Sequence, residues 1–291
     1  QISLNDAKEI SKKYELGDIV EKEVTPRNFG RIAAQTAKQV VIQRIREAER
    51  DVTFNAYLGK EGDIVNGMVS TSDKRGTVID LGKTEALMLT TDQIPGEELR
   101  IGERVKAYIT KVEKSLKGPQ VFISRTHPGL VKRLFELEVP EIYEGIIEII
   151  SVAREAGSRT KMAVMAKMET IDPVGSCVGK KGIRIQNIIN ELNGEKIDVI
   201  EWDADPATFI SASLLPAKIL AVDIKEEEKF AQVIVPDDQL SLAIGKSGQN
   251  ARLAARLTNW KIDIKSESQF REMLMKKAEE ANAAADAEMS E

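Results

Sequence analysis

The sequence is poor in cysteine, histidine and long apolar runs. Cys177 is the only cysteine among the 291 residues, and His127 is the only histidine. A single thiol cannot form an internal disulfide, which predicts a protein of a reducing compartment, the cytoplasm. No apolar run approaches the roughly 18 residues of a membrane span, so no membrane association is expected. No segment has the pattern of a signal peptide.

Acidic residues outnumber basic ones, which argues against a protein that coats nucleic acid along its whole surface. The formal net charge is −5. Two windows, residues 173–190 and 239–262, nevertheless contain basic residues and no acidic residue. Their basic residues include Lys180, Lys181, Arg184, Lys246, Arg252, Arg256 and Lys261. Positive charge gathered at two places in an acidic chain predicts local contacts with phosphate groups.

The same four-residue loop occurs in both windows. Gly179-Lys180-Lys181-Gly182 and Gly245-Lys246-Ser247-Gly248 start 66 residues apart, and each lies between an apolar stretch and an apolar run at helical spacing. A Lys-Ile-Asp string with strand character follows each copy. Such a loop lets the main chain approach a sugar-phosphate closely, as in a clamp for single-stranded nucleic acid. One copy alone would be interpreted as a plain turn, but two copies in matching surroundings favour the clamp.

Hydrophobic periodicity separates a helical segment from a β-rich one. Residues 1–58 have helical spacing, and a helix with a basic face is expected over residues 27–50. The chain lacks an initiating Met and opens inside a helical pattern, so we expect the first part of this domain to be missing. Residues 59–127 contain five short β-rich runs separated by turn signals, which predicts a small closed barrel of the OB type.

The rest of the chain repeats one pattern. Residues 128–203 and 204–268 both follow the order α-β-β-α-α-β, which predicts two copies of one supersecondary unit and a multi-domain α+β protein. Trp202 and Trp260 flank the two Lys-Ile-Asp strings and are expected to pack in a core or a domain interface. Residues 226–228, all glutamate, are interpreted as a turn and not as a metal site. Residues 269–291 start as a helix and become an Ala- and Glu-rich tail expected to be disordered.

Four strings carry a resemblance to a known family. They are Asp-Pro-Val-Gly-Ser-Cys-Val-Gly at 172–179, Glu-Lys-Ile-Asp at 195–198, residues 239–252, and Ser-Arg-Thr-His-Pro at 124–128. With the order of the predicted domains, these strings resemble the NusA family of bacterial transcription factors. The resemblance implies the C-terminal part of a polymerase-binding domain (1–58), an S1 domain (59–127) and two tandem type II KH domains (128–203 and 204–268).

The resemblance also implies a function and partners. It implies a factor without enzymatic activity that binds RNA polymerase and nascent single-stranded RNA. Such a factor modulates pausing, termination and antitermination, and it works with other antitermination factors. Neither a metal nor another cofactor is expected, and the protein is expected to be a monomer.

The RNA-binding residues are predicted from the two loops and the helices after them. They are Gly179, Lys180, Lys181, Gly182, Arg184, Gly245, Lys246, Ser247, Gly248, Asn250 and Arg252. The glycines would pack against the RNA backbone and the lysines would attract phosphates. Arg184, Asn250 and Arg252 are expected to reach base edges or phosphates. Val178 and Ile244 are predicted to form the apolar floor of the groove.

Other segments keep two interpretations each. The barrel has only Tyr108 and Phe122 as aromatic residues, whereas barrels that bind single strands stack bases on aromatic rings. It is therefore either an RNA reader, through Lys74, Arg75 and Lys83, or a spacer. The basic helix is either a polymerase-facing surface or a solvated helix. For the single cysteine and histidine, a buried thiol and a connector position are favoured over catalysis.

Three rival functions have weaker support. The string Gly245-Lys246-Ser247 matches the end of a phosphate-binding P-loop. That motif needs another glycine five residues before Gly245, and position 240 is Leu. Phosphorolytic exoribonucleases also carry KH and S1 modules, but in the opposite order and behind large catalytic domains. A non-catalytic S1/KH subunit of an RNA-degradation complex is the main alternative, although the tandem repeat and the helical N-terminal segment fit it poorly.

Overall fold

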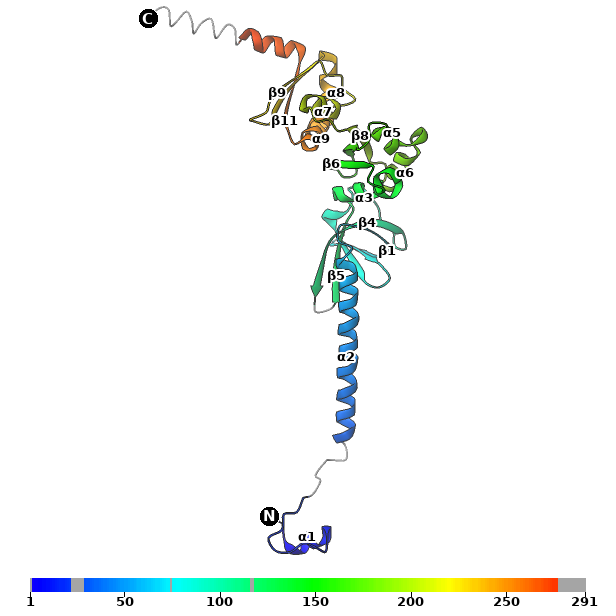
Figure 1. Ribbon diagram of the computed structural model, residues 1–291, viewed down its shortest axis with the longest axis vertical. Coiled ribbons are helices and arrows are strands. Elements are labelled where there is room, and N and C mark those ends of the chain that lie inside the picture. The colour runs from blue at the N-terminus through cyan, green and yellow to red at the C-terminus, as the bar shows by residue number, and fades with distance from the viewer. Residues whose placement is uncertain (1, 22–28, 74, 116–117, 277–291) are drawn as a thin grey trace, which may run out of the picture. The chain divides into compact units, whose positions relative to one another are not determined.

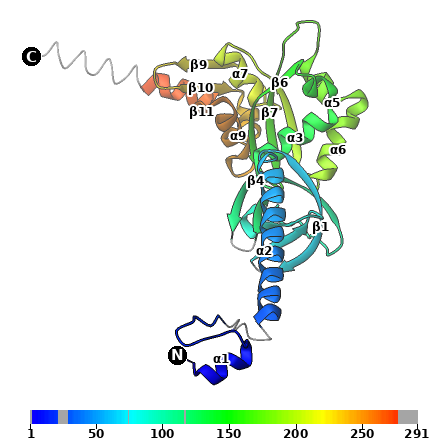
Figure 2. The ribbon, with the colours of Figure 1, turned by 60° about the horizontal axis from the view of Figure 1, so that its bottom comes forward.

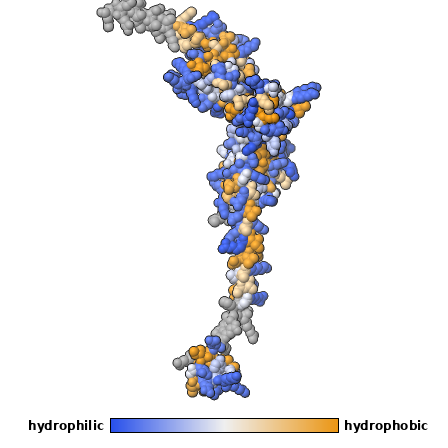
Figure 3. All heavy atoms as spheres, viewed as in Figure 1, coloured by the Kyte–Doolittle hydropathy of each residue, from blue (hydrophilic) through white to orange (hydrophobic). Residues whose placement is uncertain are grey.

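The computed structural model describes residues 2–21, 29–73, 75–115 and 118–276, and the chain divides into two compact units, residues 1–52 and 53–291. In the first unit, helix α1 (Leu4–Ile10) begins after Ser3, whose hydroxyl accepts a hydrogen bond from the Asp6 N–H. Helix α2 (Phe29–Leu58) starts in the first unit and ends in the second. Figure 3 shows apolar side chains exposed along α2; they include Ile32, Val40, Val41, Ile45 and Val52.

The predicted basic helix is present from residue 29 onward. Arg31 and Lys38 are exposed on it, whereas Arg27 lies outside the described residues. Among the helices of the described ranges, none combines the length and apolar character that a membrane span requires.

Five strands form a closed barrel in the second unit, as predicted (Figure 1). They are β1 (Ile64–Asp73), β2 (Gly76–Asp80), β3 (Glu85–Leu89), β4 (Arg104–Ser115) and β5 (Gly118–Ser124). The barrel order is β1-β2-β3-β5-β4, and the β3–β5 pair is parallel. The inward-pointing side chains of the strands form the barrel core, in which Ile79, Met88 and Ile109 are fully buried.

The first repeat follows directly and contains α3 (Pro128–Glu138), α4 (Pro140–Tyr143), β6 (Ile147–Glu155), β7 (Arg159–Ala166), α5 (Pro173–Val178), α6 (Ile183–Glu191) and β8 (Lys196–Glu201). Its sheet has the order β6-β7-β8, with β7 and β8 parallel. One face of this sheet packs on its own helices around Phe135, Met162 and Leu192. The short helix α4 is an element that the sequence pattern did not predict.

The second repeat contains α7 (Pro206–Ser213), β9 (Ala221–Lys225), β10 (Phe230–Val235), α8 (Leu240–Ile244), α9 (Gln249–Thr258) and β11 (Lys261–Ser266). Its sheet has the order β11-β10-β9 and the same parallel pair at one edge. The order α-β-β-α-α-β is therefore confirmed in both repeats. Residues 226–228 form the predicted turn between β9 and β10.

Helix α9 of the second repeat covers the free face of the first repeat's sheet. Leu253 and Leu257 of α9 pack against Ala153 of β6 and Ala163 of β7, and all four side chains are buried. Figure 2 shows α9 on one side of β6 and β7 and helices α3, α5 and α6 on the other. Small alanine side chains let the helix approach the sheet closely, so the two repeats form one packed body. Trp202 packs at this interface and Trp260 in the second repeat's core, as predicted.

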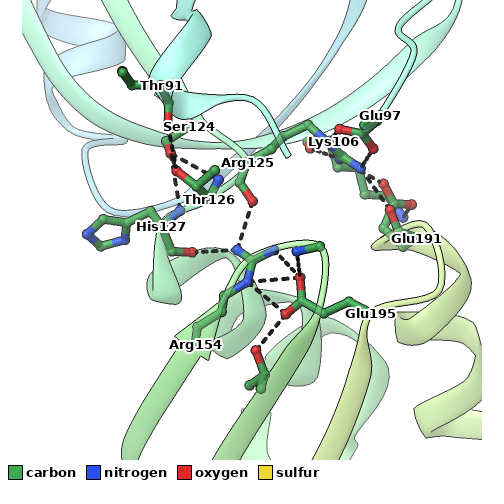
Figure 4. Close-up of polar contacts among 12 residues, drawn as sticks. Thr91, Glu97, Lys106, Ser124, Arg125, Thr126, His127, Arg154, Glu191 and Glu195 are labelled. Atoms are coloured by element: carbon green, nitrogen blue, oxygen red, sulfur yellow. Dashed lines mark hydrogen bonds and ion pairs between the residues drawn. The ribbon is translucent and has the colours of Figure 1, made fainter. Parts of the chain in front are cut away.

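An ionic network joins the barrel to the first repeat (Figure 4). The Arg125 guanidinium donates to both carboxylate oxygens of Glu97, at 2.8 and 2.5 Å, and to the Glu191 carbonyl oxygen at 2.8 Å. Arg154 donates to both oxygens of Glu195 and to the carbonyl oxygens of Arg125 and His127. The connection between the barrel and the first repeat is thus hydrogen-bonded to both of them.

His127 occupies this connection, as the interpretation of a connector position predicted. Its Nδ1 accepts a hydrogen bond from the Gly129 N–H and caps the start of α3. Its ring stacks on Tyr108 of the barrel, with 4.5 Å between ring centroids and an angle of 7° between the planes. Desolvation lowers the pKa of His127 below its ordinary value, because burial disfavours the charged ring.

Cys177 lies at the end of α5, fully buried in the core of the first repeat. Burial raises the pKa of its thiol to about 12, so the reactive thiolate is scarce at neutral pH. We predict that N-ethylmaleimide labels the folded protein at pH 8 at least about 100-fold more slowly than the urea-unfolded chain. Mass spectrometry of timed samples measures the two rates. Equal rates would contradict the buried position.

Candidate nucleic-acid interface

The two Gly-x-x-Gly loops have the same backbone conformation. Gly179 and Gly245 have φ/ψ of 76°/170° and 76°/171°. Lys181 and Ser247 have 56°/25° and 52°/29°, and the closing glycines Gly182 and Gly248 have 75°/14° and 74°/15°. A positive φ is uncommon outside glycine, yet both loops hold a non-glycine residue there. The repeated sequence therefore encodes one shared loop shape.

The first glycine of each loop admits no side chain. Its φ and ψ fall in a region that is essentially restricted to glycine. A Cβ on Gly179 would lie 2.8 Å from the Arg184 side chain, and a Cβ on Gly245 would lie 2.8 Å from the backbone nitrogen of Asn250. The closing glycines are less confined, since a Cβ on Gly248 would meet its nearest neighbour at 3.8 Å. The first glycine is thus fixed by conformation and space, and the closing glycine by conformation alone.

Each loop leads directly into a helix whose first turn has no side-chain cap. The N-terminal caps of α6 and α9 are Gly182 and Gly248, and neither offers an acceptor side chain. The N–H groups of Ile183 and Gln249 donate to the carbonyl oxygens of Lys180 and Lys246 in the preceding turn. The N–H groups after them in a first helical turn lack partners within the helix, and the helix dipole adds positive potential there. An anionic oxygen is a suitable acceptor at such a helix start.

Three exposed lysines lie on the loops, two on the first and one on the second. They are Lys180, Lys181 and Lys246. Within the described part of the chain, none of them forms an ion pair. Their charge is therefore not neutralised by a carboxylate of the protein.

Arg184 and Asn250 occupy equivalent positions, five residues after the first glycine of each loop, and both hold the preceding short helix. Arg184 donates from Nη1 to the Ser176 carbonyl oxygen at 2.7 Å, at the end of α5. Asn250 donates from Nδ2 to the Ala243 carbonyl oxygen at 3.0 Å, at the end of α8. These side chains satisfy carbonyl groups that a helix end leaves without partners.

Asn250 is more deeply buried than its predicted role in RNA contact requires. Its side chain was expected to reach RNA, but the residue is 3% exposed, and Nδ2 also donates to the Leu214 carbonyl oxygen at 3.0 Å. Both amide hydrogens are thus used inside the protein, whereas Oδ1 has no hydrogen-bond partner among the described residues. Asn250 therefore supports the second loop from inside, and its contact with RNA stays a prediction.

The two arginines near the loops are paired with carboxylates. Arg184 donates to Glu141 of α4 at 3.0 Å, and Arg252 donates from Nε to Glu155 of β6 at 2.7 Å. The pKa of Glu155 is lowered, first by the hydrogen bond from Arg252. Both arginine side chains remain partly exposed, at 30% and 45%. Each is placed beside its loop with part of its charge already balanced.

Val178 and Ile244 immediately precede the two loops. Val178 is half-buried and Ile244 is 37% exposed, so both contribute apolar surface there. Whether they form the floor of an RNA groove stays a prediction. On the barrel, Arg75 and Lys83 are exposed, and Arg75 pairs with Asp73 at 3.5 Å. Lys74 lies outside the described residues.

Sequence reasoning missed the carboxylates that hold the arginines. Glu141 and Glu155 lie 43 and 97 residues from their partners Arg184 and Arg252. Ion pairs across such separations leave no local pattern of charge. The only available signal was the absence of acidic residues around the loops, which places any balancing carboxylate on a distant segment.

Family comparisons cover nearly the whole chain. Models of the NusA N-terminal domain and the S1 RNA binding domain match residues 1–51 and 59–124. Models of the NusA-like first and second KH domains match residues 125–202 and 206–272.

Curated relatives agree with the family models, and each carries the name transcription termination/antitermination protein NusA. The protein of Halalkalibacterium halodurans is 60% identical over 273 residues, which cover 94% of this chain and 72% of the relative. That of Bacillus subtilis is 58% identical over 273 residues, covering 94% and 74%. That of Thermus thermophilus is 42% identical over 283 residues, covering 96% and 73%.

The unequal confinement of the loop glycines gives a stability prediction. Gly245→Ala should lower the free energy of unfolding by about 2 kcal/mol or more, because it adds a clash to an unfavourable backbone conformation. Gly248→Asn should lower it by less than about 1 kcal/mol, since asparagine tolerates the left-handed region. Urea denaturation of both variants measures the difference. Equal losses would show that the first glycine is not the more constrained of the two.

Proposed function

The chain belongs to the NusA family of transcription termination/antitermination proteins, and from this premise we propose that its two Gly-x-x-Gly loops bind nascent single-stranded RNA while the protein associates with RNA polymerase. The family assignment gives the chain an S1 RNA binding domain and two KH domains. The observation that carries the proposal is the pair of loops with one backbone conformation, each leading into a helix without a side-chain cap. The first loop has two lysines and the second has one, and none of the three forms an ion pair within the described residues.

In the proposed complex, the RNA backbone lies against the main chain of each loop. The first glycine exposes the backbone without a Cβ, and the N–H groups of α6 or α9 donate to phosphate oxygens. Lys180, Lys181 and Lys246 add Coulombic attraction, which weakens as salt concentration rises. A KH module of this kind holds about four nucleotides. Bases are then free to contact the apolar surface at Val178 and Ile244.

Both loops belong to one packed body, which favours a single continuous RNA ligand. Once a strand is bound at one loop, its next nucleotides reach the other loop at a high effective concentration. The gain in affinity requires no tighter contact at either site. Arg184 and Arg252 lie beside the loops and, in this proposal, make secondary phosphate contacts while they remain paired with their carboxylates.

The transcriptional role we propose is the modulation of pausing, termination and antitermination, in the cytoplasm and without catalysis by this protein. RNA held at the loops would influence the hairpins and pauses that form as the transcript emerges. Polymerase association is supported by the match of residues 1–51 to the NusA N-terminal domain. The exposed basic and apolar residues of α2 are the surface we assign to it.

Charge reversal in the loops tests the RNA site. Lys180→Asp with Lys181→Asp, combined with Lys246→Asp and Ser247→Asp, should lower affinity for an unstructured RNA oligonucleotide at least about 100-fold, because carboxylates repel phosphate. Aspartate tolerates the left-handed conformation at positions 181 and 247, so the melting temperature should stay within about 2 °C. Fluorescence anisotropy and thermal melting measure both quantities.

The control is Lys12→Asp with Lys13→Asp, which makes the same charge change as Lys180→Asp with Lys181→Asp at an adjacent exposed pair outside the KH domains. It should bind RNA nearly as well as the unmodified protein, and the RNA should be recovered intact from every sample. Equal binding by the control and the loop variant would refute the site.

The partner is tested separately by retention on immobilised protein. We expect core RNA polymerase to be retained and the ring of a phosphorolytic exoribonuclease to pass through. Removal of residues 1–52 should reduce polymerase retention without changing RNA affinity, because the loops lie in the other compact unit. Retention of the exoribonuclease ring instead would favour a subunit of an RNA-degradation complex.

A further inference from the structure

The turn between β6 and β7 of the first repeat reaches across to the second repeat's loop. Glu155 ends β6 and accepts two hydrogen bonds from the first turn of α9. Its Oε1 accepts from Arg252 Nε at 2.7 Å, and its Oε2 accepts from Gln249 Nε2 at 2.8 Å. Gln249 Nε2 also lies 2.7 Å from the hydroxyl oxygen of Ser158, in the same turn.

These contacts continue into the loop itself. Gln249 directly follows Gly248, so a hydrogen bond to its side chain fixes the residue next to the loop. Arg252 donates from Nη1 to the carbonyl oxygen of Ser247 at 3.1 Å. Ser247 has a φ of 52°, a conformation that needs support from its surroundings in a residue other than glycine. Glu155 therefore holds the two side chains that border the loop and support its shape.

The carboxylates that support the two loops differ in their origin. At the first loop, Arg184 is held by Glu141 of the same repeat. At the second loop, Arg252 and Gln249 are held by Glu155 of the other repeat. The second loop thus relies on the first repeat for a contact that the first loop obtains within its own repeat.

Docking of α9 does not depend on these polar contacts. The buried side chains Leu253 and Leu257, one and two turns further along α9, pack on the sheet of the first repeat. Apolar burial of this kind supplies most of the stability of a helix–sheet contact. Glu155 is in contrast about one quarter exposed and lies at the rim. Its removal should leave α9 docked and release only its first turn.

We propose that Glu155 is a positioning residue for RNA binding by the second loop, so that the first repeat prepares the RNA site of the second. This inference rests on the proposed function of that loop. Glu155 acts through Gln249 and Arg252 and needs no contact with RNA. The charge-assisted hydrogen bond to Arg252 is the stronger of its two contacts.

The sign of the effect separates positioning from simple electrostatics. Glu155 is an acid beside a phosphate-binding loop, and removing an acid there raises the local positive potential. A carboxylate without a positioning role would, when removed, leave RNA affinity unchanged or increase it. A positioning carboxylate would, when removed, decrease RNA affinity despite the more favourable charge.

The experiment reads the second loop alone by using the full chain with Lys180→Asp and Lys181→Asp as background. Glu155→Ala in this background should weaken binding of an unstructured RNA oligonucleotide about three- to ten-fold in anisotropy titrations. Glu155→Gln retains the shape and should have a smaller effect in the same direction. Glu148→Ala removes an exposed acid from the same strand and serves as the control.

Hydrogen exchange without RNA measures positioning directly. Amide exchange over residues 245–252 should become faster in Glu155→Ala and stay unchanged in Glu148→Ala, with the melting temperature within about 2 °C. Unchanged exchange, or unchanged or tighter RNA binding, would overturn the inference while leaving the loop as an RNA site. If the background protein binds RNA no better than the variant with all four loop substitutions, the second loop's proposed function fails as well.

Discussion

The first glycine of each loop fixes the positions of the two helices that the loop connects. Gly179 and Gly245 turn the chain through a conformation essentially restricted to glycine, and this turn sets α6 and α9 at fixed angles to the short helices before them. The residue five positions on then caps the preceding helix, through a guanidinium in one repeat and an amide in the other. A guanidinium and an amide can support the same loop because each donates a hydrogen bond to a carbonyl oxygen of the helix before it.

Through the packing of α9, the two repeats are joined in space as well as along the chain. A KH sheet has one face covered by its own helices, and the other face of the first repeat is covered by the helix that follows the second loop. The helix that follows the second loop is therefore also the element that joins the repeats. Any shift of α9 on the sheet would move the second loop, so the relative placement of the two loops is set by apolar packing.

Local patterns in the sequence were sufficient for the repeated architecture and the loops. Strand and helix order, the five-stranded barrel, the turn at 226–228 and the buried Cys177 follow from periodicity and from the types of residue present. The burial of Asn250 was not foreseen, because a position in a basic window does not reveal burial. The short helix α4, and the ion pairs made by Glu141 and Glu155, depend on tertiary contacts between distant segments, which a single sequence does not display.

The buried ion pair Arg154–Glu195 contributes more to the orientation of the barrel relative to the first repeat than to the free energy of unfolding. Both side chains are fully buried, and the desolvation of two charges offsets most of their attraction. Both side chains nevertheless make further hydrogen bonds. Arg154 also donates to the carbonyl oxygens of Arg125 and His127, and Glu195 also accepts from Thr160 and Gly157. A rotation of the barrel against the repeat would break the hydrogen bonds from Arg154 to the carbonyl oxygens of Arg125 and His127 and leave buried polar groups without partners, so the network favours one arrangement. The network therefore orients the barrel relative to the sheet that carries α9, and so relative to both loops. The two loops thus have a defined position relative to the S1 domain.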